Sequence, residues 1–135
     1  MTPSTTDHGQ LTTDTPRSLE DAVAAARVCD DYRGQDTLVL DLTGITPICD
    51  YFVLTTATNR RQLHAIADEV DRVLREAGSR RMGREGYDSD SWIVQDYGDV
   101  VLHVFTPQTR ELYDLDNLWG DAPRIDWQPG SDSDD

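Results

Sequence analysis

The segment "YFVLTTATNRRQLHAIADEVDRVL", Tyr51 to Leu74, changes its hydrophobic period halfway along and decides the fold class. Its first six residues are apolar on both faces and predict a strand, Tyr51–Thr56, in the middle of a sheet. Thr58 or Asn59 can cap the helix that follows, and Gly78 ends it. The apolar stripe of this helix consists of Leu63, Ile66, Ala67, Val70, Val73 and Leu74. A central strand followed by an amphipathic helix indicates an α/β domain.

The residues before this segment predict one more helix and one more strand. Ser18 followed by Asp21 is typical of a helix start, because the hydroxyl caps a free amide and the acid favours the positive end of the helix dipole. Apolar residues then recur at helical spacing as far as Gly34, which is a stop signal. The run "TLVLDL", Thr37–Leu42, alternates in part and predicts a strand.

The residues after this segment predict a hairpin and a last helix. In "WIVQDYGDVVLHVF", two short apolar runs flank Tyr97, Gly98 and Asp99, and a Gly and an Asp between β-branched runs favour a hairpin. Thr109 to about Leu115 then suits a short helix. The predicted order is α-β-β-α-β-β-α, which indicates a small mixed β-sheet with helices packed on it.

Chain length and composition indicate one globular domain. A chain of 135 residues is long enough for a single core, and 37% of it is hydrophobic. We predict a domain over residues 18–127, between a disordered tail at 1–17 and an acidic disordered tail at 128–135. Ile125 and Trp127 are the apolar residues near the end that can pack back onto the domain.

The chain is strongly acidic. It has 26 Asp and Glu against 12 basic residues, all of them Arg, and a formal net charge of -14. This charge disfavours direct binding to DNA or bare RNA, which relies on Lys and Arg displacing counterions, and it favours a basic partner. The alternative is that the acidity serves solubility or salt adaptation and carries no information about partners.

Cysteine spacing and the N-terminus indicate the compartment. Cys29 and Cys49 lie far apart with no C-x-x-C spacing, which supports neither a zinc ribbon nor a disulfide framework and fits a reducing cytoplasm. The sequence "MTPSTTDHGQ" lacks the blocks of a signal peptide, and no apolar run approaches the roughly 20 residues of a membrane span. We therefore expect a cytoplasmic protein without a membrane partner.

The acids offer the main argument for an enzyme. The pairs Asp88/Asp90 and Asp114/Asp116 have the D-x-D spacing that can hold magnesium, and Asp41 can add a third carboxylate. In so acidic a chain, such pairs also arise by chance. The sequence has neither G-x-x-x-x-G-K nor G-x-G-x-x-G, the glycine loops that cradle phosphates.

The histidines do not suggest a catalytic site. His8 is in the predicted tail, His64 is near the start of the long helix, and His103 is inside the run "VVLHVF". A lone His on a strand is more often a hydrogen-bonded packing residue than a ligand or a base. A nucleophile elbow is also missing. We expect no enzymatic activity.

Three linked segments resemble the ribosomal silencing factor family, also called the Iojap family. Their specific parts are "CDYFVL" followed by "T-x-x-x-Q", "EG" before "W-I-V-x-D-x-G-D-V-x-x-H-V-F", and "R-x-x-Y-D-L-x-x-L-W". They occur in the order and at the spacing of that family, and the resemblance runs from about Leu19 to Trp119. Agreement at so many linked positions makes a chance match very improbable.

The resemblance implies both a fold and a function. The fold is a small mixed α/β domain related to nucleotidyltransferases but without their catalytic machinery or a cofactor. Proteins of this family bind the large ribosomal subunit through its protein L-fourteen, on a surface that otherwise bridges to the small subunit. The bound factor blocks subunit joining and represses translation. The family also forms homodimers when free.

The resemblance also implies partner-binding residues. Trp92 matches the contact tryptophan of the family, and Tyr113 and Leu115 match two further contact positions. We add Asp96, Asp99 and Asp114 as acids at the rim of the contact, because they neighbour these residues in the hairpin and in the last helix. Leu115 stays ambiguous, because helical spacing sends it toward the core while the resemblance sends it to the partner.

Two alternatives remain open at this point. The first is a divergent metal-dependent nucleotidyltransferase that uses Asp41 and the D-x-D pairs. The second is a self-associating scaffold, which is favoured only if the protein captures no ribosomal partner.

Overall fold

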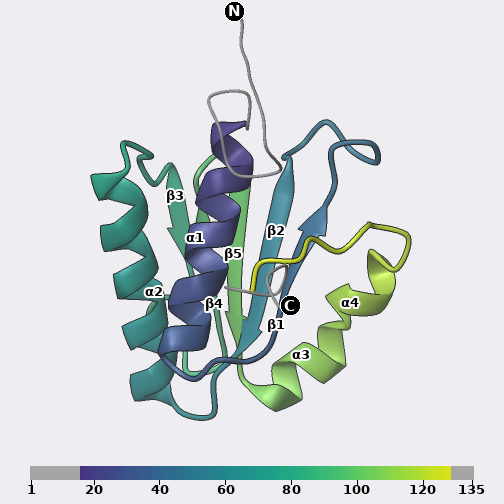
Figure 1. Ribbon diagram of the computed structural model, residues 1–135. Coiled ribbons are helices and arrows are strands. Elements are labelled where there is room, and N and C mark those ends of the chain that lie inside the picture. The colour runs from purple at the N-terminus through teal and green to yellow at the C-terminus, as the bar shows by residue number, and fades with distance from the viewer. Residues whose placement is uncertain (1–15, 129–135) are drawn as a thin grey trace, which may run out of the picture.

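The computed structural model describes residues 16–128, which form one five-stranded sheet and its helices (Figure 1). The predicted tails at 1–17 and 128–135 lie outside the described residues, apart from Pro16, Arg17 and Gln128. The elements are α1 (Arg17–Asp31), β1 (Gln35–Asp41), β2 (Tyr51–Thr56), α2 (Arg60–Glu76), β3 (Gly83–Glu85), β4 (Trp92–Asp96), β5 (Val100–Phe105), α3 (Pro107–Tyr113) and α4 (Leu115–Leu118). The predicted mixed α/β class is confirmed.

The sheet has the strand order β1-β2-β5-β4-β3. The central strands β2 and β5 run parallel, with Tyr51 opposite Val100, and every other neighbouring pair is antiparallel. The run "YFVLTT" therefore lies inside the sheet and between two other strands, as its two apolar faces predict.

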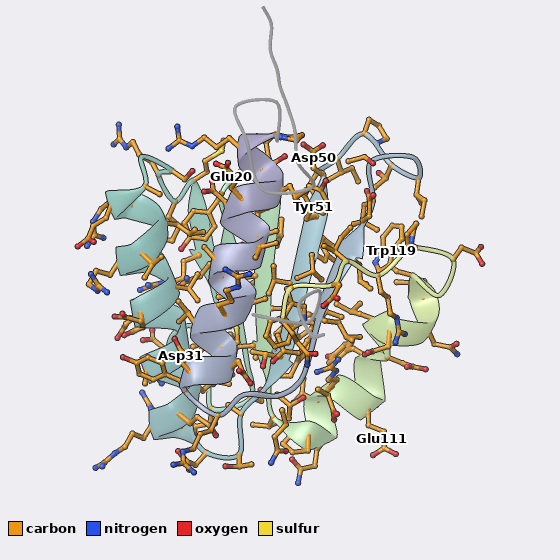
Figure 2. The ribbon with its side chains drawn as sticks, viewed as in Figure 1. Glu20, Asp31, Asp50, Tyr51, Glu111 and Trp119 are labelled. Atoms are coloured by element: carbon orange, nitrogen blue, oxygen red, sulfur yellow. The ribbon has the colours of Figure 1, made fainter. Side chains whose placement is uncertain are left out.

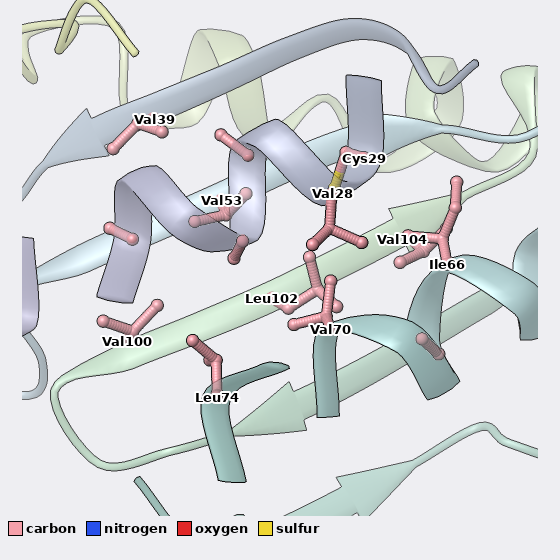
Figure 3. Close-up of a cluster of buried hydrophobic side chains, with 14 of the residues drawn as sticks. Val28, Cys29, Val39, Val53, Ile66, Val70, Leu74, Val100, Leu102 and Val104 are labelled. Carbon is pink, nitrogen blue, oxygen red and sulfur yellow. The ribbon is translucent and has the colours of Figure 1, made fainter. Parts of the chain in front are cut away.

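Helices α1 and α2 lie side by side over one face of the sheet (Figure 1). Their apolar stripes meet the alternate residues of β1, β2 and β5 in the main core, and Figure 3 shows Leu102 and Val104 of β5 among Val28, Ile66 and Val70 of the two helices. Each of these side chains is buried, and burying one aliphatic side chain contributes about 1.5–3 kcal/mol. This face of the sheet is closed.

The start of α2 is fixed by side chains, as its sequence predicts. The Asn59 side chain accepts a hydrogen bond from the Gln62 amide at 2.9 Å, so Asn59 is the cap and Thr58 is not. Gln62 in turn accepts from the Thr58 amide at 2.8 Å and donates to the carbonyl oxygens of Tyr32 and Arg33. The cap therefore also ties α2 to the end of α1.

The predicted cap of α1 is wrong. The helix begins at Arg17 with Pro16 in the cap position and no side-chain cap, while Ser18 is buried in the first turn. Asp21 accepts a hydrogen bond from the Ser79 hydroxyl, which joins α1 to the end of α2. Such a contact between segments distant in sequence cannot be predicted from local spacing.

The polar stretch between α2 and β4 contains a strand that the sequence patterns do not predict. Strand β3 has three residues and pairs antiparallel with β4, with Gly83 opposite Asp96 and Glu85 opposite Val94. Arg84 of β3 donates to the Gln95 side chain at 2.8 Å. Three polar residues show no measurable alternation, so only the neighbouring strand identifies them as part of the sheet.

The predicted helix over Thr109 to about Leu115 is present as α3, but it ends at Tyr113 and a second short helix, α4, follows it. Asp114 has a left-handed backbone, with φ of 51°, which ends α3 at Tyr113 and lets α4 begin at Leu115. The Asp114 carbonyl oxygen accepts from the amides of Asn117 and Leu118, which starts the new helix. Asp and Asn tolerate this conformation better than most residues.

The last described residues form a strap along the outer edge of β1. The Asp41 amide donates to the carbonyl oxygen of Pro123 at 2.8 Å, and the Ile125 amide donates to the carbonyl oxygen of Val39 at 2.9 Å. The Trp127 indole reaches the carbonyl oxygen of Thr37 at 3.1 Å, and its ring is buried in the main core. The stretch containing Ile125 and Trp127 therefore does pack back onto the domain.

Candidate functional site: the second face of the sheet

The face of the sheet opposite α1 and α2 is only partly covered, and we call it the second face. Its central residues are buried beneath α4 and the adjacent loops: Leu40, Leu42, Cys49, Leu54, Phe105 and Ala122. Around them Val94 of β4 and Val101 of β5 stay partly exposed. Figure 2 shows Trp119 on the side of the molecule that carries α3 and α4, with Glu111 projecting away from the sheet. This face is the candidate site.

Six rings form a connected aromatic cluster on the second face: Phe52, Trp92, His103, Phe105, Tyr113 and Trp119. Trp92 lies at its centre, stacked on Phe105 at 5.2 Å between ring centroids and 4.7 Å from Tyr113. Tyr113 is 54% exposed and Trp92 is half-buried. Strand β4 and helix α3 thus bring together Trp92 and Tyr113, which are 21 positions apart in the sequence.

A hydrogen bond within this cluster links the two strands of the hairpin. The Trp92 indole N–H donates to Nδ1 of His103 at 3.2 Å. The second ring nitrogen of His103, Nε2, is buried and has no hydrogen-bond partner within residues 16–128. Phe52 lies 4.6 Å from the imidazole, so the ring is held among other rings.

Burial keeps His103 neutral and makes stability depend on pH. Desolvation lowers the pKa of His103 from 6.5 to about 4. Between pH 6.5 and 4.5 the unfolded chain therefore binds a proton that the folded chain does not bind, and the free energy of unfolding decreases as pH falls. We expect His103 to account for a loss of about 2 kcal/mol over this range.

Urea unfolding of the wild-type chain and of His103→Leu at several pH values measures this loss. The variant lacks the titrating group, so the stability of wild type relative to the variant should fall by about 2 kcal/mol as pH falls from 6.5 to 4.5. Carboxylates titrate in both proteins and cancel in the difference. Parallel curves would show that His103 does not resist protonation.

An ion pair holds α3 and α4 in their bent arrangement. Arg110 donates to both carboxylate oxygens of Asp116, at 3.1 and 2.8 Å, and to the Thr56 hydroxyl at 2.9 Å. Its side chain is only 11% exposed. The hydrogen bonds from Arg110 lower the pKa of Asp116. A bidentate pair of this kind fixes direction as well as distance, so it sets where Tyr113 lies.

Two hollows flank the aromatic residues. A groove of about 330 Å³ crosses β3, β4 and β5 and is lined by Gly83, Arg84, Glu85, Val94, Asp96 and Val101. A pocket of about 470 Å³ lies between β1 and α3, where four acids, Asp36, Glu111, Asp114 and Asp116, outnumber Arg110 and Arg124. The surroundings of the second face are therefore rich in carboxylates.

The structure places five of the six predicted site residues in two groups. Trp92 and Tyr113 are in contact, and Asp114 follows at the exposed helix junction. Asp96 and Asp99 lie at the other end of the hairpin, about 13 Å from Trp92 along β4. Asp96 lines the groove and Asp99 is exposed at the turn, so they do not neighbour Trp92 as expected. The role of all these residues in binding stays a prediction.

Leu115 is half-buried and packs against the buried residues of the second face. Its contacts favour the core over the partner. The helical spacing behind that expectation does not hold, because Asp114 breaks the helix. The outward positions next to the break belong to Leu112 and Leu118, which are 76% and 68% exposed. Neither leucine is among the predicted site residues.

The acids of the enzymatic alternative do not come together. Asp41 ends β1 at one edge of the sheet, and Asp90 precedes β4 near the other edge, where it pairs with Arg60 at 2.8 Å. Asp116 is engaged by Arg110. Within the described part of the chain, no group of three or more His, Cys, Asp or Glu residues could hold a metal ion.

Known proteins resemble this chain in sequence. The profile of a family described as "Ribosomal silencing factor during starvation" matches residues 15–135. The chain is 43% identical over 102 residues to ribosomal silencing factor RsfS of Bacillus subtilis (strain 168), covering 76% of this chain and 86% of the relative. It is 33% identical over 113 residues to the chloroplastic protein Iojap of Arabidopsis thaliana, covering 84% of this chain and 47% of Iojap.

Solved structures resemble it in fold. A crystal structure of a Chromobacterium violaceum protein aligns with a TM-score of 0.74 at 35% identity, covering 78% of this chain and 88% of that one. A Bacillus halodurans protein aligns with a TM-score of 0.66 at 34% identity, covering 80% and 95%. Among residues 16–128 no helix has the length and apolar character needed to cross a membrane. The relatives' names indicate a regulatory factor rather than an enzyme, and the chain belongs to the ribosomal silencing factor family.

Proposed function

We propose that this protein binds the large ribosomal subunit through ribosomal protein L-fourteen and sterically blocks joining of the small subunit, which represses translation. The observation that carries the proposal is the contact between Trp92 and Tyr113 on the incompletely covered second face. The resemblance in sequence implies that both residues match contact positions of the family, to which the chain belongs. The proposed docking surface is the aromatic cluster together with the groove over β3, β4 and β5.

A steric blocker needs a rigid surface and tight binding, and it needs no acid, base or metal. Trp and Tyr are the residues that most often carry the affinity of protein interfaces, especially when neighbouring residues exclude water around them. The Arg110–Asp116 pair and the stacking of Trp92 on Phe105 hold these two aromatics in place before the partner arrives. Such preorganisation reduces the entropy lost on binding.

Charge supports a protein rather than an RNA contact on the ribosome. Ribosomal proteins are usually basic because they sit on RNA, and a chain with a net charge of -14 attracts them and is repelled by bare phosphate. Long-range attraction of this kind speeds encounter, and added salt weakens it. Charge therefore supports a basic ribosomal protein as the contact, and the resemblance to the family implies that this protein is L-fourteen.

Sedimentation with purified ribosomal subunits tests the proposal. The protein should sediment with large subunits and not with small subunits, and it should reduce the fraction of joined ribosomes formed when small subunits are added. Purified L-fourteen should compete with the large subunit for binding to the protein. Normal subunit joining in the presence of a saturating excess of the protein would refute steric blocking, even if binding were seen.

We further propose that the free protein is a cytoplasmic homodimer and that dimer formation competes for the second face. Light scattering on the free protein gives its oligomeric state, and added L-fourteen should then convert dimers into one-to-one complexes. A variant that remains dimeric but no longer binds L-fourteen would show that the two contacts use separate residues.

A further inference from the structure

His103 occupies an unusual position for a polar side chain. It lies on β5 in the middle of the aromatic cluster, where Phe52 is 4.6 Å and Phe105 is 5.7 Å from its ring centroid. Only 7% of the residue is exposed. The rings around it belong to Phe52, Trp92 and Phe105. An apolar side chain of similar size would fill the same space, so packing does not by itself require a histidine.

The contact with Trp92 fixes the proton of this imidazole. An indole N–H can only donate, so Nδ1 of His103 must accept and must carry no proton. A neutral imidazole carries its proton on the other nitrogen, here Nε2. That N–H is buried without an acceptor among residues 16–128, which costs free energy. The fold therefore tolerates an unsatisfied donor in order to keep an acceptor beneath Trp92.

The geometry points to His103 as the positioning residue for Trp92. Phe105 stacks on one side of the indole at an interplanar angle of 26°, and Tyr113 contacts it from α3. Stacking alone permits the ring to slide and rotate, whereas a hydrogen bond to a fixed acceptor selects one orientation. His103 thus prepares Trp92 for binding without touching the partner itself.

This arrangement also specifies the chemistry that Trp92 offers. Because its only donor is engaged by His103, Trp92 presents ring carbon and π surface and no hydrogen bond. The matching spot on the partner is then an apolar or cationic side chain, which a basic protein supplies readily, and not a carbonyl or carboxylate oxygen. Any hydrogen bonds to the partner must come from other groups of the second face, including the hydroxyl of Tyr113. The identity of that partner rests on the proposed function.

Hydrogen exchange of the Trp92 indole, followed by NMR on the free protein, tests the positioning directly. Trp92→Phe assigns the resonance among the three tryptophans of the chain. The wild-type indole N–H should exchange at least tenfold more slowly than in His103→Leu, which removes the acceptor. His103→Asn places an amide oxygen near the position of Nδ1 and should restore slow exchange, whereas His103→Gln should not.

Affinity for large subunits is the second measurement. His103→Leu should weaken binding roughly three- to tenfold, because the indole must then be ordered on docking, and His103→Asn should bind within about twofold of wild type. A residue that serves packing alone would instead give losses that follow the melting temperatures of the variants. Equal affinity of wild type and His103→Leu would overturn the role in binding.

The two measurements separate this inference from the proposed function. Exchange needs no ribosome, and a wild-type indole N–H that exchanges as fast as free tryptophan would overturn the inference without the use of any variant. If the exchange pattern is as expected but the wild-type protein does not bind large subunits, the proposed function fails and His103 still holds Trp92.

Discussion

Replacement of both Trp92 and Tyr113 by alanine is expected to abolish binding to large ribosomal subunits while the sheet stays folded. The two rings lie 4.7 Å apart on the second face, and the double replacement removes the exposed ring of Tyr113 and the half-buried ring of Trp92. Residues of this kind typically contribute about 2 kcal/mol or more each, so the pair accounts for roughly a thousandfold in affinity.

Stability and binding must be separated in this experiment. Trp92 also packs on Phe105, so its truncation lowers the free energy of unfolding by about 2 kcal/mol, less than for a fully buried tryptophan. Tyr113 is more exposed, so its truncation should lower the free energy of unfolding by less. Circular dichroism and urea unfolding of the double variant should therefore show a folded protein of reduced stability.

Tyr32→Ala is a matched control for this pair. Tyr32 is an exposed tyrosine at the C-terminal end of α1, outside the aromatic cluster. Its truncation should leave sedimentation with large subunits unchanged. If the double variant binds as tightly as wild type, the second face is not the docking surface. Equal losses in the double variant and the control would point to a general effect of aromatic truncation.

Gly86→Ala is expected to lower the free energy of unfolding by about 4 kcal/mol. Gly86 has φ of 78°, and a Cβ there would collide with the carbonyl oxygen of Trp92, which belongs to the backbone and cannot rotate away. The left-handed conformation costs a non-glycine residue about 1–2 kcal/mol, and overpacking adds about 1–3 kcal/mol. Gly86 is the glycine of the "EG" motif, and this collision explains why the motif needs a glycine at that position.

Gly83→Ala provides the control, because a Cβ at Gly83 meets no atom within 4 Å and its φ is not positive. Urea unfolding should show a small change for Gly83→Ala and a large one for Gly86→Ala. The latter should also weaken binding to large subunits, because the start of β4 carries Trp92. If both variants are equally stable, the turn relaxes and the collision is not decisive.

Sequence patterns predicted the elements whose hydrophobic period is strong. Tyr51–Thr56 has the predicted bounds, and the helix after Asn59 has the predicted cap. The misses have physical causes: β3 is too short to show a period, and the break at Asp114 depends on one backbone angle. The relation to nucleotidyltransferases stays a prediction.

The candidate site was predictable in part. The resemblance named Trp92 and Tyr113, which the fold brings into contact. Proximity in sequence misplaced Asp96 and Asp99, because a strand separates its two ends by many ångströms. His103 looked like an ordinary packing residue, since only the tertiary structure reveals which of its nitrogens is engaged and which is left alone.

The strap along β1 also limits how copies of this chain can assemble. Sheets that keep a long free edge can recruit further strands without limit, which leads to fibres. Here the strap occupies the β1 edge, and β3 at the other edge has only three residues with which a further strand could pair. In the proposed homodimer, association would use the second face instead, where two copies related by a twofold axis would each bury the surface that a third copy needs. The geometry favours a closed pair over an open polymer.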